Sequence, residues 1–114
     1  MVLLDEEKIA ELRRIERLAG APNILSNFVR NLESGVTKFG EAFSQCVACG
    51  DGRAAERIAH TLKGHCLQLG VQGLADLFTE IEREAKAGRY AEAQRQFENA
   101  APLIAESLNA LKQA

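Results

Sequence analysis

Apolar residues recur at three- and four-residue steps along almost the whole chain, and this pattern predicts helices and no strands. In the first segment, four apolar residues follow one another every three positions among charged side chains: Ile9, Leu12, Ile15 and Leu18. We expect an amphipathic helix from about Asp5 to Ala19. Gly20-Ala21-Pro22 then ends this helix and starts the next, because glycine commonly follows a helix end and proline is tolerated at a first helical position.

The strongest periodicity follows Pro22 and predicts a long second helix. Its apolar positions are Leu25, Phe28, Val29, Leu32, Val36, Phe39, Phe43, Cys46 and Val47. Gly35 and Gly40 lie inside this helix, where each costs roughly 1 kcal/mol relative to alanine, and they mark either close helix contacts or a bend. Gly50-Asp51-Gly52 breaks the pattern. Asp51 is a suitable N-cap for a third helix, which continues to about Leu69, where Gly70 is well placed to end it.

Two further segments complete the helical pattern. The fourth helix carries Leu74, Leu77, Phe78, Ile81 and Ala85, and stops near Gly88. The fifth carries Tyr90, Ala93, Phe97, Ala101, Ile104, Leu108 and Leu111. Pro102 removes a backbone donor and should kink or split this helix near residues 99–101. Because the connections are only about two to four residues long, consecutive helices should be antiparallel neighbours. The expected fold is all-α, an antiparallel up-down four-helix bundle with an additional N-terminal helix packed against one end or side.

Composition and charge fit a single helical domain spanning residues 1–114. The 114 residues are 46% hydrophobic, which suits one core. With 14 Lys and Arg against 16 Asp and Glu, the net charge of −2 argues against a nucleic-acid partner. No apolar run approaches the ~20 residues that a membrane span needs. The acidic start at Asp5-Glu6-Glu7 is unlike a secretory signal, so we expect a cytoplasmic protein without membrane insertion.

The third helix presents an uncommon group of residues on one face. His60, Lys63 and Gly64 stand at i, i+3 and i+4, which makes them one contiguous patch of helix surface. At about 100° per residue, the apolar stripe of Leu62 and Cys66 faces away from His60, so we expect His60 to be exposed. Gly64 costs roughly 1 kcal/mol in a helix interior and leaves room for another molecule beside the imidazole.

These residues match the motif of a known family. The pattern is His-x-x-Lys-Gly with a second glycine ten positions after the histidine, here His60, Lys63, Gly64 and Gly70. It resembles the histidine-containing phosphotransfer (HPt) domain of multistep phosphorelays. The resemblance implies a helical bundle in which His60 accepts a phosphoryl group from an aspartyl phosphate on a response-regulator receiver domain and passes it to another receiver. Lys63 would be the nearby cation and Gly64 the clearance for the receiver. Residues 65 and 66 depart from the small residues that usually follow in this family.

The chemistry of His60 agrees with this interpretation. Neutral imidazole is a good nucleophile near its unperturbed pKa of about 6.5. Lys63 would supply positive charge one turn away, although a solvated surface lysine is the ordinary alternative. The chain has no glycine-rich phosphate loop and no acidic cluster for Mg²⁺, so we expect no cofactor here and Mg²⁺ on the partner receiver. We therefore expect a phosphoryl carrier without its own ATP site, which also fits a domain of a hybrid sensor histidine kinase.

Leu67 lies on the His60 face and does not belong to the apolar stripe of its own helix. Although a single exposed leucine is ordinary, beside Gly64 it predicts an apolar docking patch for a receiver. Gln68 lies at the border of this face and is a candidate partner of the imidazole or the phosphoryl group, or else a solvated side chain. The charged residues Arg53, Glu56 and Arg57 form the expected rim, which would tune encounter rate and partner choice.

Three other interpretations remain open. Cys46-x-x-Cys49 and His65-Cys66 carry zinc-ligand chemistry, but Cys46 and Cys66 fall on apolar stripes, where cysteine usually acts as a small hydrophobe. A second alternative is the phosphoryl-acceptor module of a chemotaxis-type histidine kinase, whose separate ATP-binding domain would phosphorylate His60 directly. The third is a non-catalytic helical-bundle adaptor that uses the same face only to bind protein.

Overall fold

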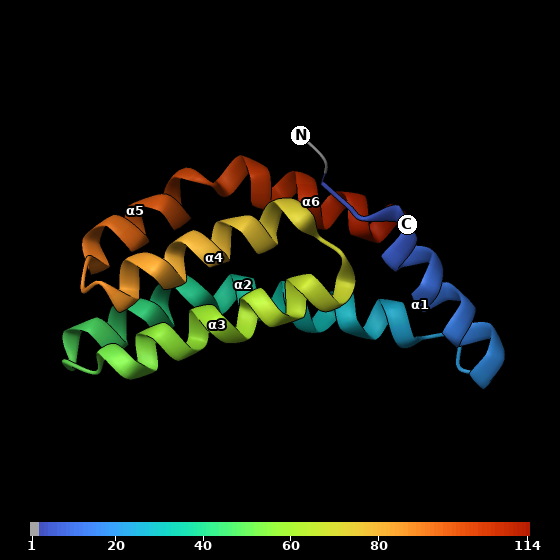
Figure 1. Ribbon diagram of the computed structural model, residues 1–114, viewed down its shortest axis with the longest axis horizontal. Helices are drawn as coiled ribbons and strands as arrows, with labels where there is room; N and C mark the ends of the chain where they lie inside the picture. Colours follow the sequence, from blue (N-terminus) through green and yellow to red (C-terminus); the bar gives the residue numbers. More distant parts are fainter. Residues whose placement is uncertain (1–2) are drawn as a thin grey trace.

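Six helices and no strand make up residues 3–114, which are the residues that this computed structural model describes (Figure 1). The helices are α1 (Glu6–Ala19), α2 (Ile24–Ala48), α3 (Gly52–Leu69), α4 (Gln72–Lys86), α5 (Tyr90–Asn99) and α6 (Ala101–Gln113). The all-helical prediction is confirmed. None of these helices is both long and apolar enough to cross a membrane.

The helix ends agree closely with the local sequence signals. Asp5 Oδ1 accepts hydrogen bonds from the backbone N–H groups of Glu7 and Lys8 at 3.1 and 3.3 Å and caps α1. Asp51 Oδ1 accepts from the N–H of Ala54 at 3.0 Å, so its predicted role as an N-cap is confirmed. Gly70 ends α3 as expected, with a φ of 70° in the left-handed region that favours glycine.

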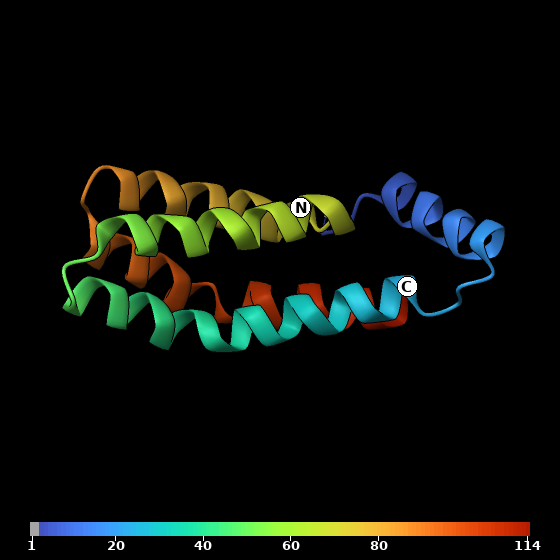
Figure 2. The same cartoon turned by 90° about the horizontal axis from the view of Figure 1, so that it is seen from below.

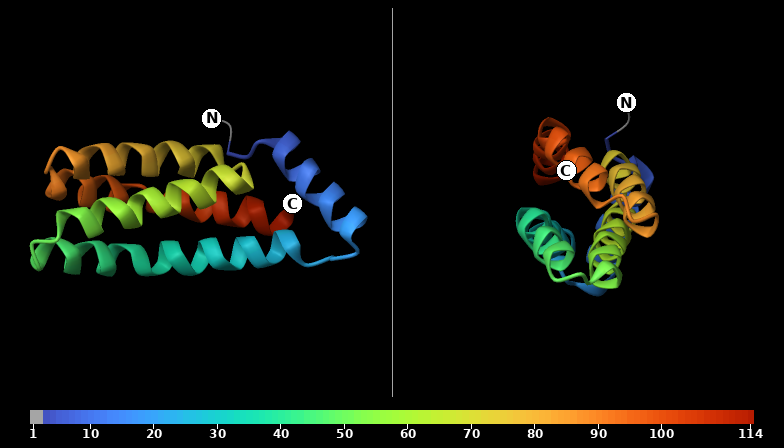
Figure 3. Two further views of the ribbon diagram at one scale, coloured as in Figure 1. Left: turned by 60° about the horizontal axis from the view of Figure 1, so that its bottom comes forward. Right: turned by 90° about the vertical axis from the view of Figure 1, so that its left-hand side faces the viewer.

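Four helical segments, namely α2, α3, α4 and the consecutive pair α5–α6, lie side by side along the 46 Å axis of the molecule. The views in Figures 1 and 2 show that α2, α3, α4 and the pair α5–α6 run in alternating directions, as their short connections require. Figure 3 shows α1 at one end, inclined to the other helices. The α3–α4 pair has the closest association, and this pair carries the candidate site described below.

The core contains aromatic rings from three helices. Phe39 of α2 packs edge-on against Phe78 of α4 with the ring centroids 5.3 Å apart, and it also contacts Phe97 of α5. A Cβ added to Gly35 would lie 2.8 Å from Leu62 Cδ2, and one added to Gly40 would lie 3.3 Å from the ring of Phe97. Both glycines therefore allow the close helix contacts that were one of the two alternatives for them.

The two prolines of the chain differ in their effect on the helix boundaries beside them. Pro102 splits the last segment as expected, because α5 ends at Asn99 and α6 begins at Ala101, where a missing N–H costs nothing. Pro22 does not start α2, which is a correction. The helix begins at Ile24, because the Glu16 carboxylate of α1 accepts the N–H of Leu25 at 2.8 Å and caps α2 in place of a local side chain.

The predicted apolar stripe of α1 is only half buried. Ile9 and Leu12 belong to the core, whereas Ile15 and Leu18 are 42% and 82% exposed. The physical reason is the position of α1. Its N-terminal end is held at the end of α3, where the N–H of Asp5 donates to the carbonyl of Gly70, while its C-terminal half projects beyond the neighbouring helices.

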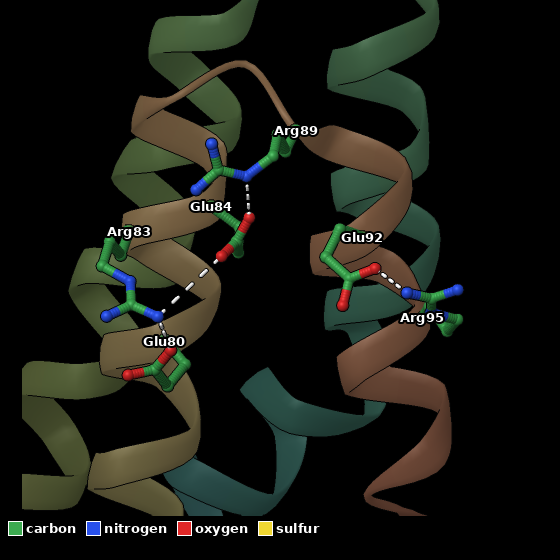
Figure 4. Close-up of polar contacts among 6 residues, drawn as sticks. All are labelled: Glu80, Arg83, Glu84, Arg89, Glu92 and Arg95. Atoms are coloured by element: carbon green, nitrogen blue, oxygen red, sulfur yellow. Dashed lines mark hydrogen bonds and ion pairs between the residues drawn. The ribbon is translucent and has the colours of Figure 1, made fainter.

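Ion pairs surround the turn between α4 and α5 (Figure 4). Glu84 is 6% exposed and accepts a hydrogen bond from Arg89, and Arg83 lies on its other side with an N–O distance of 3.9 Å. Hydrogen bonding from Arg89 is the main cause that lowers the pKa of the Glu84 carboxyl. The figure also shows that Arg83 pairs with Glu80 in the preceding turn of α4. These contacts fix the end of α4 against the start of α5.

Candidate functional site

His60 projects from the face of α3 that points away from the core. The opposite face of this helix is buried, with Ala55, Ala59, Leu62 and Cys66 at 5% exposure or less. The His60 side chain is 64% exposed, so the exposure expected from helical rotation is confirmed. Its ring is accessible to another protein without any movement of the helix.

A buried carboxylate from α4 contacts the ring of His60. Glu82 Oε2 lies 2.8 Å from His60 Nδ1, and Glu82 is only 5% exposed. An ionised carboxylate can only accept hydrogen bonds, so Nδ1 must carry the proton and donate it. In the neutral imidazole the lone pair then lies on Nε2. This arrangement leaves Nε2 as the nucleophilic atom of an exposed ring.

Two lysines share the same carboxylate. Lys63 Nζ lies 2.7 Å from Glu82 Oε1, and Lys86 Nζ lies 3.7 Å from Glu82 Oε2. Burial raises the pKa of Glu82, but the hydrogen bonds from Lys63 and His60 outweigh it, so the pKa lies below its ordinary value. Glu82 therefore stays ionised at neutral pH. Lys63 was predicted as a cation near His60, with a solvated surface lysine as the ordinary alternative, and the structure finds it in an ion pair with Glu82.

A charged hollow of about 410 Å³ adjoins the imidazole between α3 and α4. Its lining consists of Arg53, Glu56, Arg57, His60, Glu82 and Lys86. The rim residues expected from the sequence are thus brought beside His60. Three cations face two carboxylates in this hollow, and this excess of positive charge favours an anionic group next to the ring.

The residues predicted to dock a partner lie on two sides of α3. Gly64 and Leu67 are both exposed, Leu67 by 51%, and a Cβ added to Gly64 would meet nothing within 4 Å. Gln68 lines a separate hollow on the side of α2, together with Phe28 and Asn31. It stands eight residues from His60, or about 12 Å along the helix axis, so it does not reach the imidazole. The ring instead donates its hydrogen bond to Glu82.

The cysteines do not form a metal site in the described part of the chain. Within residues 3–114, no group of three or more His, Cys, Asp and Glu side chains is arranged to hold a metal ion. Cys66 is fully buried, and burial raises the pKa of its thiol to about 12. Cys46 is half-buried and Cys49 is exposed. The zinc alternative therefore lacks a ligand set among the described residues.

Glu82 is the residue of this site that the sequence analysis missed. A signal for it exists, because Glu82 follows Phe78 by four residues and precedes Ala85 by three, which puts a carboxylate on the buried face of α4. A buried carboxylate needs a partner, since leaving it unpaired is costly. The pattern did not indicate which helix would supply that partner.

Comparison with known proteins supports the interpretation of the site. Searches of curated proteins and of solved structures give no significant match. The family model of the Hpt domain matches residues 23–114, a range that includes α2 to α6, His60, Lys63 and Glu82. The chain therefore belongs to the Hpt domain family, and its role lies in phosphotransfer within two-component signalling.

Proposed function

We propose that His60 accepts a phosphoryl group from an aspartyl phosphate of one response-regulator receiver domain and relays it to another receiver. The Nε2 lone pair attacks phosphorus, the bond from phosphorus to the aspartyl oxygen breaks, and the aspartate leaves as a carboxylate. In the second step an aspartate of the other receiver attacks phosphorus and the N–P bond breaks. The observation that carries this proposal is the exposed ring whose Nδ1 is held by the buried Glu82.

Glu82 has two roles in this proposal. It keeps the proton on Nδ1, so that the lone pair of the neutral ring stays on Nε2. When Nε2 binds phosphorus while Nδ1 keeps its proton, the ring becomes positively charged, and a carboxylate 2.8 Å away stabilises that charge. Glu82 acts through His60 and is therefore a positioning residue.

Positive charge at the site comes from both sides of Glu82. Lys63 helps to keep the carboxylate ionised, and Lys86 lies near its other oxygen, so two cations lie close to the group that contacts the imidazole and would stabilise a phosphoryl group there. The Mg²⁺ ion that phosphoryl transfer uses would be supplied by the receiver. A phosphoryl donor that needs no ATP site on this chain agrees with the absence of a phosphate loop from its sequence.

The docking face in this proposal runs along α3 beside His60. Gly64 gives clearance, and Leu67 supplies an apolar contact with the receiver, while Gln68 lies at its border toward α2. For the architecture, we take α2, α3, α4 and the α5–α6 pair as the four members of an up-down bundle, with α1 as the added helix. We treat residues 1–114 as one domain that works in the cytoplasm together with its receivers.

The decisive experiment supplies the phosphoryl group in two ways. In one arm the protein is mixed with receiver domains previously phosphorylated by acetyl phosphate, and in the other with a histidine kinase and ATP. We expect transfer from the receiver, with a label that is lost in acid and kept in base, as expected for a phosphoramidate. Transfer only from the kinase would support the chemotaxis-type alternative instead.

A matched pair of variants assigns the acceptor. His60→Gln should abolish the label, whereas His65→Gln should leave it intact, because His65 is also exposed on α3 but points about 140° away from His60. Retention of the label in His60→Gln would overturn the assignment. Binding of a receiver without any label on the wild-type protein would favour the adaptor alternative.

A further inference from the structure

The C-terminal half of α1 carries an exposed surface that no part of the described chain covers. Ile15 and Leu18 are 42% and 82% exposed, which makes Leu18 the most exposed large apolar residue in residues 3–114. Arg14 and Arg17 lie beside them, are exposed, and make no ion pair within the same described range. We call these four residues the α1 tip. The tip lies outside residues 23–114, so the family fold does not account for it.

A groove of complementary character lies between α4 and the α5–α6 break. It has a volume of about 460 Å³ and an apolar floor to which Leu77 and Leu103 contribute. The acidic residues Asp76 and Glu80 stand on its α4 side. Gln96 also lines it, and the side-chain carbonyl oxygen of Gln96 is buried without a hydrogen-bond donor. We call this feature the α4–α5–α6 groove.

The groove is rich in acceptors and the tip is rich in donors. Arg14 and Arg17 are opposite in charge to Asp76, which is bonded only to the neutral Gln72, and to Glu80, which also pairs with Arg83. On one side of the arginines around α1, Leu18 and then Ile15 match the apolar floor. Charge and hydrophobicity thus agree for the same pair of surfaces.

We propose that the α1 tip of one copy of this protein occupies the α4–α5–α6 groove of a second copy. A groove of this size holds only a few side chains, and one such contact is smaller than the roughly 1,200–2,000 Å² of a stable interface. Two equivalent contacts around a twofold axis double the buried area. The association is therefore a reciprocal dimer, in which each copy supplies one tip and one groove.

This dimer leaves the phosphotransfer site open. On α4, Leu77 and Gly73 of the groove lie about 140° and 180° around the helix from Glu82, which faces His60. The groove and the imidazole therefore occupy opposite sides of α4. Dimerisation and receiver docking use different surfaces, so both can occur together.

Sedimentation velocity over a wide range of protein concentration tests the proposal. The wild-type protein should shift from the mass of one chain to that of two. Leu18→Glu should raise the dimer dissociation constant by at least roughly tenfold, because it places a carboxylate in an apolar groove with an acidic border. Leu67→Glu is the matched control, since it changes an exposed leucine on the receiver face and should leave the dimer intact.

A charge-swap experiment identifies the two surfaces. The double variant Arg14→Glu, Arg17→Glu and the double variant Asp76→Lys, Glu80→Lys should each be monomeric, because like charges then meet at both contacts. Mixed in equal amounts, they should form a heterodimer in which both contacts pair opposite charges. Phosphotransfer to His60 should persist in Leu18→Glu and in both charge variants.

Three results would overturn the proposal. The first is a wild-type protein that stays monomeric at all concentrations, and the second is a dimer that survives Leu18→Glu. The third is a mixture of the charge variants that stays monomeric although thermal melts show both proteins folded. If one charge variant fails to fold, Leu18→Glu and Leu18→Ser decide the question, because Leu18 is too exposed to support the core.

Discussion

His60 and Glu82 lie 22 residues apart in the sequence, yet Nδ1 of the imidazole and Oε2 of the carboxylate are only 2.8 Å apart. One partner is mostly exposed and the other is buried, so the carboxylate is shielded from water while the ring remains accessible. Partial burial makes this charge-assisted hydrogen bond stronger than a fully solvated one. The contact sets which ring nitrogen is free to react.

Replacing Glu82 should separate its charge from its role as an acceptor. Glu82→Gln keeps an oxygen for Nδ1–H but removes the negative charge, and phosphotransfer should fall by roughly tenfold or more, since hydrogen bonds to charged groups contribute about 1.5–3 kcal/mol. Glu82→Ala should lower the rate further and also weaken the preference for the Nδ1–H tautomer. Transfer time courses and imidazole nitrogen NMR shifts measure the two effects.

The neighbouring carboxylate of Glu80 provides the control for this prediction. It lies on α4 but pairs with Arg83 away from His60, so Glu80→Gln should transfer at the wild-type rate. Wild-type transfer by Glu82→Gln would show that the charge of Glu82 is not needed.

Substitution of Gly64 should raise the stability of the protein while it lowers the rate of phosphotransfer. Glutamine at this position should raise helix stability by roughly 0.5–1 kcal/mol, because it replaces a glycine in a helix interior and its Cβ meets nothing within 4 Å. Its side chain would nevertheless stand between the imidazole and an approaching receiver. A thermal melt and a transfer time course on the same sample should move in opposite directions, and faster transfer would contradict the assigned clearance.

Leu67 gives a second test of the docking face. At 51% exposure, Leu67→Ala should change the free energy of unfolding by no more than about 0.5 kcal/mol, as expected for a surface substitution. Receiver affinity or transfer rate should fall, because an apolar contact is lost. Leu62→Ala is the comparison, since truncation of the buried Leu62 should lower the free energy of unfolding by roughly 2–5 kcal/mol. Unchanged affinity in Leu67→Ala would remove this residue from the interface.

The ion pairs at the α4–α5 turn should make stability depend on acid pH. The pKa of Glu84 lies below its ordinary value of 4.5 in the folded protein, chiefly because Arg89 donates a hydrogen bond to it. The unfolded chain then binds more protons, so this stabilisation is complete above about pH 4.5 and is lost as the pH falls through the lower folded pKa. Denaturant unfolding between neutral and acid pH should show the decline.

Glu84→Gln should make that decline shallower, whereas Glu106→Gln, at an exposed position, should not. The carboxyls of Glu16 and Glu82 also have lowered pKa values and add to the effect with the same sign. An identical acid profile for Glu84→Gln and the wild type would assign the decline to those other groups.

The thiols should differ sharply in reactivity. Burial raises the pKa of Cys66 to about 12, so almost no thiolate is present near neutral pH. Alkylation followed by mass spectrometry should label the exposed Cys49 first and reach Cys66 only after unfolding. Cys66→Ala should cost roughly 1–3 kcal/mol of stability while transfer continues in the folded fraction. Labelling of both thiols at one rate would contradict the buried position.

Helical rotation alone predicted much of the site because α3 is regular from Gly52 to Leu69. Knowing the apolar stripe was enough to place His60, Gly64 and Leu67 on the opposite face, and the structure finds all three exposed. Helix ends were predictable for the same local reason, since Asp51 and Gly70 act within one turn of the chain.

The positions of the helices relative to one another were not predictable from the periodicity of each helix. The contact of Glu82 with His60 depends on how far α4 is displaced and rotated relative to α3, which neither helix encodes by itself. The exposure of Leu18 has a similar cause. Periodicity indicates which face of α1 is apolar, but not how far the neighbouring helices extend to cover it.

The connection between α3 and α4 consists of only Gly70 and Val71, because α3 ends at Leu69 and α4 starts at Gln72. A connection this short limits how far α4 can be displaced along α3, so a longer turn would relax the constraint that brings Glu82 to the imidazole, with every site residue still present in the sequence. Anyone grafting this centre onto another helical hairpin would therefore have to transplant the 22-residue spacing along with the histidine and the glutamate. The length of a two-residue turn is as much a part of the acceptor as its side chains.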